Sequence, residues 1–281
     1  NTYNSLNQMT ASKKVKGSTV QSDKNYVYDA NGNLKNETDS ITKESTDYSY
    51  DVGNRLAQAV KKEDGTVILT QTNLYNGNGQ RIQKTENGET TKYYYQGDAL
   101  LATTDAEGNK TSFQLYGLEG NVIAAGRYAG RCAGEYLTYN KDLKGSTTSL
   151  LKPDGSCALS YRYTDFGETA VCGDENLENE ICYTGGIYDE GTGLYYLNAR
   201  YYNPQDGRFL SQDTYRGEMT DYGTWNLYTY CANNPVNYVD PSGHFLVSTA
   251  VLVGVEVGGI VGAVHELFAR RAQKRQRLLH P

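Results

Sequence analysis

Residues 28–60 read YDANGNLKNETDSITKESTDYSYDVGNRLAQAV, and this stretch contains one short pattern twice. In each copy a Tyr precedes a polar turn with Gly and Asn, and an apolar residue follows, Leu34 in the first copy and Leu56 in the second. Gly and Asn accept the positive φ angles of tight turns, and flanking residues alternate between the two faces of a strand. The stretch therefore predicts two similar β-hairpins.

The pattern recurs through the first half of the chain. Units begin at Tyr3, Tyr28, Tyr50, Tyr75, Tyr95 and Tyr116, with spacings of 25, 22, 25, 20 and 21 residues. A single unit of this kind cannot bury its apolar face, whereas stacked units can. We therefore expect a long antiparallel β-meander that forms one continuous sheet.

The composition favours the same fold class. The 281 residues include 26 Tyr and 30 Gly, but 5 Phe, 5 Pro and 1 Trp. Tyr prefers strands and half-buried positions, where the ring packs and the hydroxyl keeps a polar partner. The chain also begins within a repeat unit, so we expect it to be the C-terminal piece of a longer protein.

The charge is distributed unevenly. Residues 1–244 carry 22 basic and 31 acidic residues, a net charge of −9, whereas residues 245–281 carry five basic and two acidic residues, a net charge of +3. Nucleic-acid binding normally needs a basic surface. The acidic body therefore argues against nucleic acid as its partner.

The cysteines predict neither a metal site nor a cofactor. They are odd in number, irregularly spaced and without a CxxC pair: Cys132, Cys157, Cys172, Cys182 and Cys231. The chain has three His in total, and two of them lie in the tail. We expect small buried thiols, with a Cys172–Cys182 disulfide as an open alternative.

The second half predicts further strands separated by turns. We expect a tyrosine strand over Leu194–Tyr202, a turn over residues 203–207 and a strand over residues 208–210. Arg200 and Arg208 fall near the ends of these strands. An Arg in a tyrosine-lined wall can stack on the rings and hold a carboxylate, or it can simply pack its stem on a surface Tyr.

The units YDANGNL and YDVGNRL resemble the repeats of the Rhs/YD-repeat family. Residues 139–168, 183–215 and 226–243 resemble successive blocks of that family's Rhs repeat-associated core domain, in the same order. The resemblance implies an all-β fold in which the meander of repeats (residues 1–138) spirals as part of a hollow shell. The core domain (residues 139–244) forms a plug, and residues 245–281 form a short tail, apolar and helical at its start and then basic.

The resemblance also implies a function. In the family, the shell sequesters a C-terminal polypeptide that is often a toxin. We therefore expect the shell-and-plug part of a polymorphic toxin, secreted or at the cell surface within a longer bacterial protein, whose partners are its own C-terminal cargo and immunity or delivery proteins. The alternative is an extracellular carbohydrate- or surface-binding module. Inward-facing tyrosines would favour encapsulation, and exposed tyrosine platforms would favour binding.

Many members of the family cut themselves just after a DPxG segment at the end of the core domain. Here that segment is Asp240-Pro241-Ser242-Gly243, and the resemblance places the junction between His244 and Phe245. The composition changes from polar to apolar at the same point. Asp before Pro is also a common turn opener, and that interpretation stays open.

The family mechanism is aspartyl-protease-like, with two carboxylates that share one proton. The resemblance carries these roles to Asp213 and Asp240, with Asp221 as a weaker third candidate and Arg208 as the residue that orients a carboxylate. This chain departs from the family pattern at three places: Thr214 replaces Pro, Tyr215-Arg216 replaces Ile-Gly, and His244 replaces Leu.

Residues 245–264 read FLVSTAVLVGVEVGGIVGAV, a run long enough to span a bilayer, with Glu256 near its middle. Three glycines recur at a spacing of four, and the basic cluster Arg270–Arg277 follows. These features leave three alternatives for the tail. It contacts a membrane through residues 245–277, it begins the cargo as an apolar helix held inside the shell, or it is a core helix of the body. We find no toxin catalytic site in its 37 residues.

Overall fold

A computed structural model of the chain describes residues 1–117, 120–174, 177–217 and 224–249. The regular elements among these residues are strands apart from short 3-10 helices, which confirms the predicted all-β class. The elements are β1 (Thr2–Tyr3), β2 (Met9–Lys16), β3 (Thr19–Tyr28), β4 (Leu34–Asp39), β5 (Glu44–Tyr50), β6 (Leu56–Glu63), β7 (Thr66–Tyr75), β8 (Arg81–Glu86), β9 (Glu89–Gln96), β10 (Ala99–Thr104), β11 (Lys110–Tyr116), β12 (Val122–Arg127), β13 (Tyr136–Lys141), β14 (Thr147–Leu151), β15 (Cys157–Tyr163), β16 (Thr169–Gly173), the 3-10 helix η1 (Tyr183–Gly185), β17 (Ile187–Asp189), β18 (Leu194–Leu197), β19 (Arg200–Asn203), β20 (Arg208–Phe209), the 3-10 helix η3 (Cys231–Asn233), β21 (Tyr238–Val239) and β22 (Val247–Ser248).

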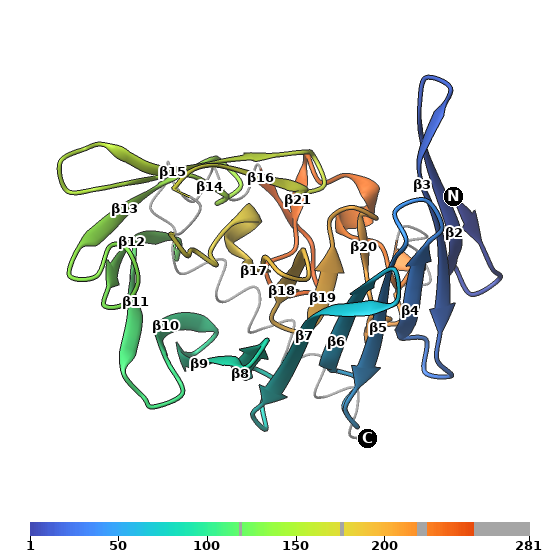
Figure 1. Cartoon of the computed structure of the whole chain (residues 1–281), viewed down its shortest axis with the longest axis horizontal. Coiled ribbons are helices and arrows are strands. Elements are labelled where there is room, and N and C mark those ends of the chain that lie inside the picture. Colours follow the sequence, from blue (N-terminus) through green and yellow to red (C-terminus); the bar gives the residue numbers. More distant parts are fainter. Residues whose placement is uncertain (118–119, 175–176, 218–223, 250–281) are drawn as a thin grey trace.

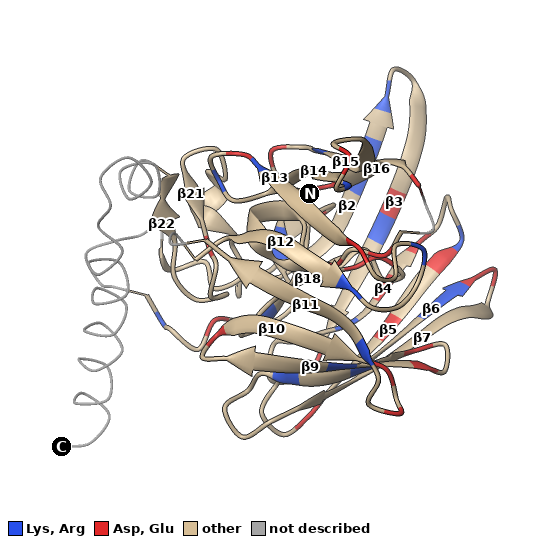
Figure 2. Ribbon diagram, turned by 90° about the vertical axis from the view of Figure 1, so that its left-hand side faces the viewer, with Lys and Arg blue, Asp and Glu red and all other residues tan. Residues whose placement is uncertain are grey.

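The first 16 strands form one antiparallel sheet in chain order, which is the predicted meander. This sheet curls around a second sheet of four strands, β17 to β20, so that β2 to β7 lie on one side of it, β8 to β13 on the other and β14 to β16 above (Figures 1 and 2). Strands β21 and β22 form a separate pair. We call the curled sheet the wall, and from here on we use the word plug for the described residues of 177–249, which include the four-stranded sheet. Strands β14 to β16 fall within the predicted core domain but belong to the wall.

The turns after Tyr3, Tyr28, Tyr50 and Tyr75 are each closed by a side-chain oxygen of the next residue, an Asp or Asn. After β3, Asp29 Oδ1 accepts the backbone N–H groups of Asn31 and Asn33 at 2.9 and 2.8 Å. Gly32 has a φ of +82°, and a Cβ there would meet Gln212 of the plug at 2.3 Å. Asp51 and Asn76 close the turns after Tyr50 and Tyr75 in the same way, and Asp142, which follows Lys141, closes the turn after β13. The Asp or Asn that follows Tyr thus sets the hairpin geometry.

The tyrosine hydroxyls connect each repeat to the previous one. Tyr75 donates to the backbone carbonyl of Leu56 at 2.7 Å, near the start of an earlier strand. Four other tyrosines repeat this bond, each with a carbonyl 14 or 16 residues earlier: Tyr50, Tyr95, Tyr116 and Tyr163. Phe could fill the space but could not make the bond. This ladder explains why the chain uses Tyr so much more often than Phe.

The core lies between the wall and the plug. Inward side chains of the wall, such as Leu34, Leu56 and Leu100, form one buried cluster with the plug tyrosines. Polar bonds cross the same interface: Tyr228 donates to the carbonyl of Gly32 at 2.6 Å. On the other side, the Tyr202 hydroxyl donates to the carbonyl of Phe166 at 2.6 Å. Wall and plug therefore form one packed unit.

The predicted tyrosine strand over Leu194–Tyr202 is wrong in one respect, because it is two strands. β18 ends at Leu197 and β19 begins at Arg200, and these two residues pair across a two-residue turn. Asn198 has a φ of +58° in this turn, a conformation that Asn tolerates better than most residues. Because of this turn, β19 runs antiparallel to β18 and begins at Arg200, whose contacts with residues near His244 are described below.

The cysteines and the tail complete the description. All five cysteines are free, so the alternative of a Cys172–Cys182 disulfide is not realised. Cys132, Cys182 and Cys231 are buried as expected, whereas Cys157 and Cys172 are exposed. At the tail, β22 pairs with β21. The predicted apolar helix and basic cluster lie almost wholly in residues 250–281, outside the described residues. Within the described part of the chain, no helix has the length and apolarity that crossing a membrane requires.

Candidate functional site

Asp213 and Asp240 are 27 residues apart in sequence, and the fold brings both to one guanidinium. Nη2 of Arg200 lies 2.8 Å from Asp213 Oδ2 and 3.8 Å from Asp240 Oδ2. The three side chains are 5 to 10% exposed. Among the described contacts, the two carboxylates meet through Arg200 rather than through a direct hydrogen bond. We call Arg200, Asp213, Asp240 and His244 the junction site.

Arg200 is held rigidly by its surroundings. Its Nη1 donates to the carbonyl of Leu227 at 2.9 Å, its Nε donates to the carbonyl of Gly243, and its guanidinium lies 3.5 Å from the centre of the Phe209 ring. These contacts use both the charge and the planar face of the side chain. Arg200 therefore binds the chain just before the predicted junction.

Asp240 organises the junction itself. Its Oδ1 accepts the backbone N–H groups of His244 and Phe245, both at 3.1 Å. Gly243 has a φ of +72° within this turn, and a Cβ there would meet the backbone oxygen of Leu197 at 2.4 Å. The turn-opening role of Asp before Pro is therefore realised. The same bond also places a carboxyl oxygen on the nitrogen of the predicted scissile bond.

His244 and Phe245 each have a partner in the segment that contains Asp213. His244 Nδ1 lies 2.9 Å from Asp213 Oδ1. The backbone N–H of Tyr215 donates to the same oxygen at 2.8 Å, and the Tyr215 ring centre is 5.9 Å from that of Phe245. The chain on both sides of the predicted junction is thus bound by the two segments that supply the carboxylates.

Burial changes the acid–base properties of the site. Desolvation raises the pKa of Asp240 above its usual value, although Arg200 and the Phe245 N–H act in the opposite direction. Desolvation also lowers the pKa of Arg200, against the attraction of both carboxylates. A carboxyl group with a raised pKa, in contact with an amide nitrogen, is suited to donate a proton to that nitrogen.

Arg208 contacts residues outside the junction site. Arg208, proposed from the resemblance as the orienting arginine, donates to the backbone oxygen of Asn7 at 2.6 Å and to Asn226 at 3.3 Å, and its guanidinium lies over the rings of Tyr3 and Tyr228. Arg200 holds the carboxylates instead. Asp221 lies outside the described residues.

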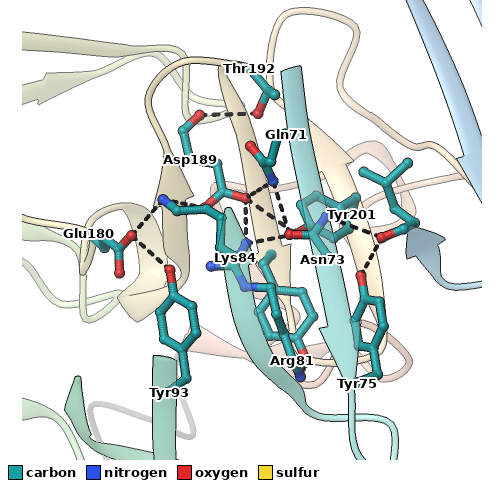
Figure 3. A network of polar contacts seen from close by, with 12 residues as sticks. Gln71, Asn73, Tyr75, Arg81, Lys84, Tyr93, Glu180, Asp189, Thr192 and Tyr201 are labelled. Carbon is teal, nitrogen blue, oxygen red and sulfur yellow. Dashed lines mark hydrogen bonds and ion pairs between the residues drawn. The ribbon is translucent and has the colours of Figure 1, made fainter. Parts of the chain in front are cut away.

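A second charged cluster joins the wall to the plug, and the sequence analysis did not single it out. Arg81 of β8 donates through Nη1 to Asp189 of β17 and to the Tyr201 hydroxyl of β19 (Figure 3). Lys84 Nζ lies 3.3 Å from Asp189 Oδ1 and 2.7 Å from Glu180 Oε1. We call Arg81, Lys84, Glu180 and Asp189 the latch.

The latch is buried among aromatic rings. Arg81 and Asp189 are 0% exposed, and the Arg81 guanidinium lies 4.6 Å from the centre of the Tyr93 ring and 4.9 Å from that of Tyr196. Burial alone would raise the pKa of Asp189, but Arg81 and Lys84 lower it to about 2. Tyr201, bound to the latch, precedes Tyr202 and follows Arg200 on β19, so one short strand connects both clusters.

Comparison with known proteins agrees with this fold. The Teneurin YD-shell family model matches residues 2–236. The chain is 35% identical to the tRNA3(Ser)-specific nuclease WapA of Bacillus spizizenii over 248 residues, 87% of this chain and 10% of that protein. It is 28% identical to the double-stranded DNA deaminase toxin A of Burkholderia cenocepacia over 210 residues, 70% of this chain and 14% of that protein.

Solved structures share the fold at low sequence identity. The TcdB2-TccC3-Cdc42 crystal structure superposes with a TM-score of 0.55 at 19% identity over 86% of this chain and 15% of that one. The structure of TcdB2-TccC3 without the hypervariable C-terminal region gives a TM-score of 0.55 at 22% identity over 79% and 13%. The chain spans about a tenth of the length of the WapA relatives. With the family model covering most of its length, this chain belongs to the Teneurin YD-shell family of Rhs/YD-repeat proteins.

Proposed function

We propose that this chain is the C-terminal shell-and-plug part of an Rhs-type toxin, that it encapsulates a C-terminal cargo polypeptide, and that it cuts itself between His244 and Phe245. The relatives named as nuclease and deaminase toxins match over 10% and 14% of their length, so a shared shell with a separate active region fits them. We also propose that the complete protein acts outside the cell or at its surface and meets delivery or immunity proteins there.

The observation that carries the proposal is the convergence of Arg200, Asp213 and Asp240 on residues 243–245. Arg200 Nε holds the Gly243 carbonyl, and Asp240 Oδ1 lies 3.1 Å from the Phe245 nitrogen. In the reaction, water adds to the carbonyl carbon of His244 while Asp213 takes a proton from it. Asp240, favoured in its protonated form by burial, gives a proton to the leaving nitrogen.

The orientation of the tyrosines supports encapsulation. Tyr26, Tyr48 and Tyr93 of the wall are buried against the plug, as are Tyr195 and Tyr202 of the plug itself. These tyrosines of the repeats therefore face the enclosed side. An inward tyrosine set around a seated plug is the arrangement that we expect of a container.

A second candidate function, binding of carbohydrate at a surface, is favoured by one group on the outer face. Tyr94, Tyr128 and Tyr136 are 48, 47 and 56% exposed, and the rings of Tyr128 and Tyr136 both pack against Gly126. Sugar rings stack on such exposed faces. A Tyr128→Ala, Tyr136→Ala double variant that loses glycan-array binding of the wild type would support this function, and an array without binding would exclude it.

The cleavage proposal is tested by the intact mass of the purified chain. We expect the wild type to give a fragment that ends at His244, and we expect Asp213→Asn and Asp240→Asn to remain uncut. Asp142→Asn is the matched control, because Asp142 also closes a turn by accepting two backbone N–H groups, those of Lys144 and Ser146, and neither residue belongs to the junction site. An uncut wild type, or an Asp240→Asn variant that is still cut, would refute the proposal.

A further inference from the structure

We propose that Asp240 binds the α-ammonium group that cleavage creates on Phe245, so that the new N-terminus stays docked on the plug after the bond is broken. This inference rests on the proposed cleavage and goes beyond it, because it assigns Asp240 a second role as a binding site. The ligand is the free N-terminus of the chain's own C-terminal segment.

The chemistry of hydrolysis produces one cation and one anion at the site. Water adds to the carbonyl carbon of His244, and the bond from that carbon to the Phe245 nitrogen breaks. The water oxygen stays on His244 as part of a carboxylate, and both water protons end on the nitrogen as an ammonium group. The α-amine has an ordinary pKa of about 8, so it is charged at neutral pH.

The Phe245 nitrogen already lies in a site suited to a cation. It is 3.1 Å from Asp240 Oδ1 and 3.2 Å from Ser242 Oγ. The Asp240 side chain is 5% exposed, so water competes little for it. Hydrogen bonds between two charged groups are roughly twice as strong as neutral ones. Cleavage therefore converts an existing neutral contact into an ion pair without requiring the nitrogen to move.

The charges of the site leave room for a second cation. Before cleavage, the guanidinium of Arg200 contacts both Asp213 and Asp240, and its distance to Asp240 is the longer of the two, 3.8 Å against 2.8 Å. The ammonium group supplies Asp240 with a cation of its own. The new carboxylate forms on His244, one residue after Gly243, whose carbonyl accepts a hydrogen bond from Arg200 Nε.

The contacts beyond the junction remain when the bond is broken. Val247 pairs with Val239 and Ser248 with Tyr238 in the β21–β22 pair. The Thr249 N–H donates to the carbonyl of Asn237 at 2.9 Å. A two-residue strand is weak on its own. We therefore expect β22 to keep the segment in register while the ammonium–Asp240 ion pair holds its end.

The test measures the reactivity of the new amine in the 281-residue chain after self-cleavage. The folded, cut protein is treated briefly with an amine-acylating reagent, and labelling at Phe245 is compared by mass spectrometry with labelling at the exposed α-amine of Asn1. We expect the Phe245 amine to react at least about tenfold more slowly when folded, which corresponds to about 1.4 kcal/mol of protection. The two amines should react at similar rates in urea.

A variant in β22 separates the contribution of the β21–β22 pair from that of the ammonium–Asp240 ion pair. Val247→Asp places a charge beside the buried Val239 and disrupts β22 without touching the junction site. We expect this variant to be cut and to keep slow labelling of the Phe245 amine, because the ion pair with Asp240 does not depend on β22. A cut variant whose Phe245 amine reacts as fast as that of Asn1 would assign the protection to β22 and overturn the inference. A cut wild type whose Phe245 amine reacts as fast as that of Asn1 would overturn this inference alone. A chain that is never cut would overturn both the inference and the cleavage on which it rests.

Discussion

The latch and the junction site contain the same kinds of charged group, but their charges are balanced differently. In the latch, the two cations Arg81 and Lys84 face Asp189 and Glu180. Burial alone would raise the pKa of Asp189, but Arg81 and Lys84 outweigh it and bring the pKa to about 2. At the junction site one guanidinium contacts two carboxylates, and the pKa of Asp240 remains raised by burial.

This difference separates a structural cluster from a reactive one. A carboxylate with its own buried cations stays charged and fixes the position of the strand that bears it. A buried carboxyl that shares its cation is more readily protonated and is available for proton transfer. The pairing of charges, rather than burial alone, therefore distinguishes the roles of Asp189 and Asp240.

The largest expected effect comes from removing one partner of the latch. Asp189→Asn should lower the free energy of unfolding by about 3–5 kcal/mol, because it leaves the fully buried Arg81 without its counter-charge. Urea unfolding measures the loss. Asp47→Asn is the control, since its ion pair with Lys62 is partly exposed to solvent and should contribute less than about 1 kcal/mol. A loss below about 1 kcal/mol in Asp189→Asn would remove the distinction between the two regions.

The ion pairs of the latch should make the free energy of unfolding depend on pH in the acidic range. The pKa of Asp189 is about 2 in the folded chain, below its ordinary value of about 3.8, so its contribution is full above that ordinary value. The contribution is lost as the pH falls toward 2. Between pH 6 and pH 2 the wild type should lose about 2 kcal/mol more than Asp189→Asn in urea unfolding. Equal losses in the two proteins would contradict the charge balance that we assign to the latch.

A smaller effect is expected where a neutral bond holds the repeats together. Tyr75→Phe removes the hydroxyl that donates to Leu56 and should cost about 1 kcal/mol in thermal or urea unfolding. Tyr94→Phe, on the exposed outer face, should change stability by less than about 0.5 kcal/mol. If both variants unfolded alike, the hydroxyl ladder would not contribute to the wall.

The smallest effect on stability is expected at the junction site. The pKa of Asp240 is raised in the folded state, so its charged form costs stability as the pH rises through that pKa. The amide oxygen of Asn can still accept the N–H groups of His244 and Phe245. Asp240→Asn should therefore unfold within about 1 kcal/mol of the wild type at pH 7. A loss as large as that of Asp189→Asn would make Asp240 a structural residue.

Sequence patterns predicted the wall well, because its contacts are local. Tyr28, Tyr50 and Tyr75, each with the Asp or Asn that follows it, define hairpins within a few residues, and neighbouring hairpins pair in chain order. The two-strand break at Asn198 was missed, because a run of apolar and tyrosine residues conceals a turn made by one Asn. The signal was the Asn itself, which accepts the positive φ of a two-residue turn.

The charged clusters were harder to predict, because their partners are distant in sequence. Arg81 and Asp189 are 108 residues apart, and neither stands in a motif that indicates the other. Arg200 and Arg208 both begin a strand of the plug, and the choice between them depends on which side chain the sheet turns toward the junction. The family resemblance identified Asp213 and Asp240 as candidate site residues. Arg200 was assigned to this site only from the structure, in which it begins β19 and contacts both carboxylates.

The central claim is that the junction site hydrolyses the bond between His244 and Phe245. The most direct measurement is the mass of the fragments formed when the uncut chain is refolded in water enriched in ¹⁸O. Hydrolysis predicts a fragment that ends at His244 with one heavy oxygen in its new carboxylate, together with an unlabelled fragment that begins at Phe245. A chain that stays whole, a cut at another bond, or an end at His244 without heavy oxygen would contradict the account.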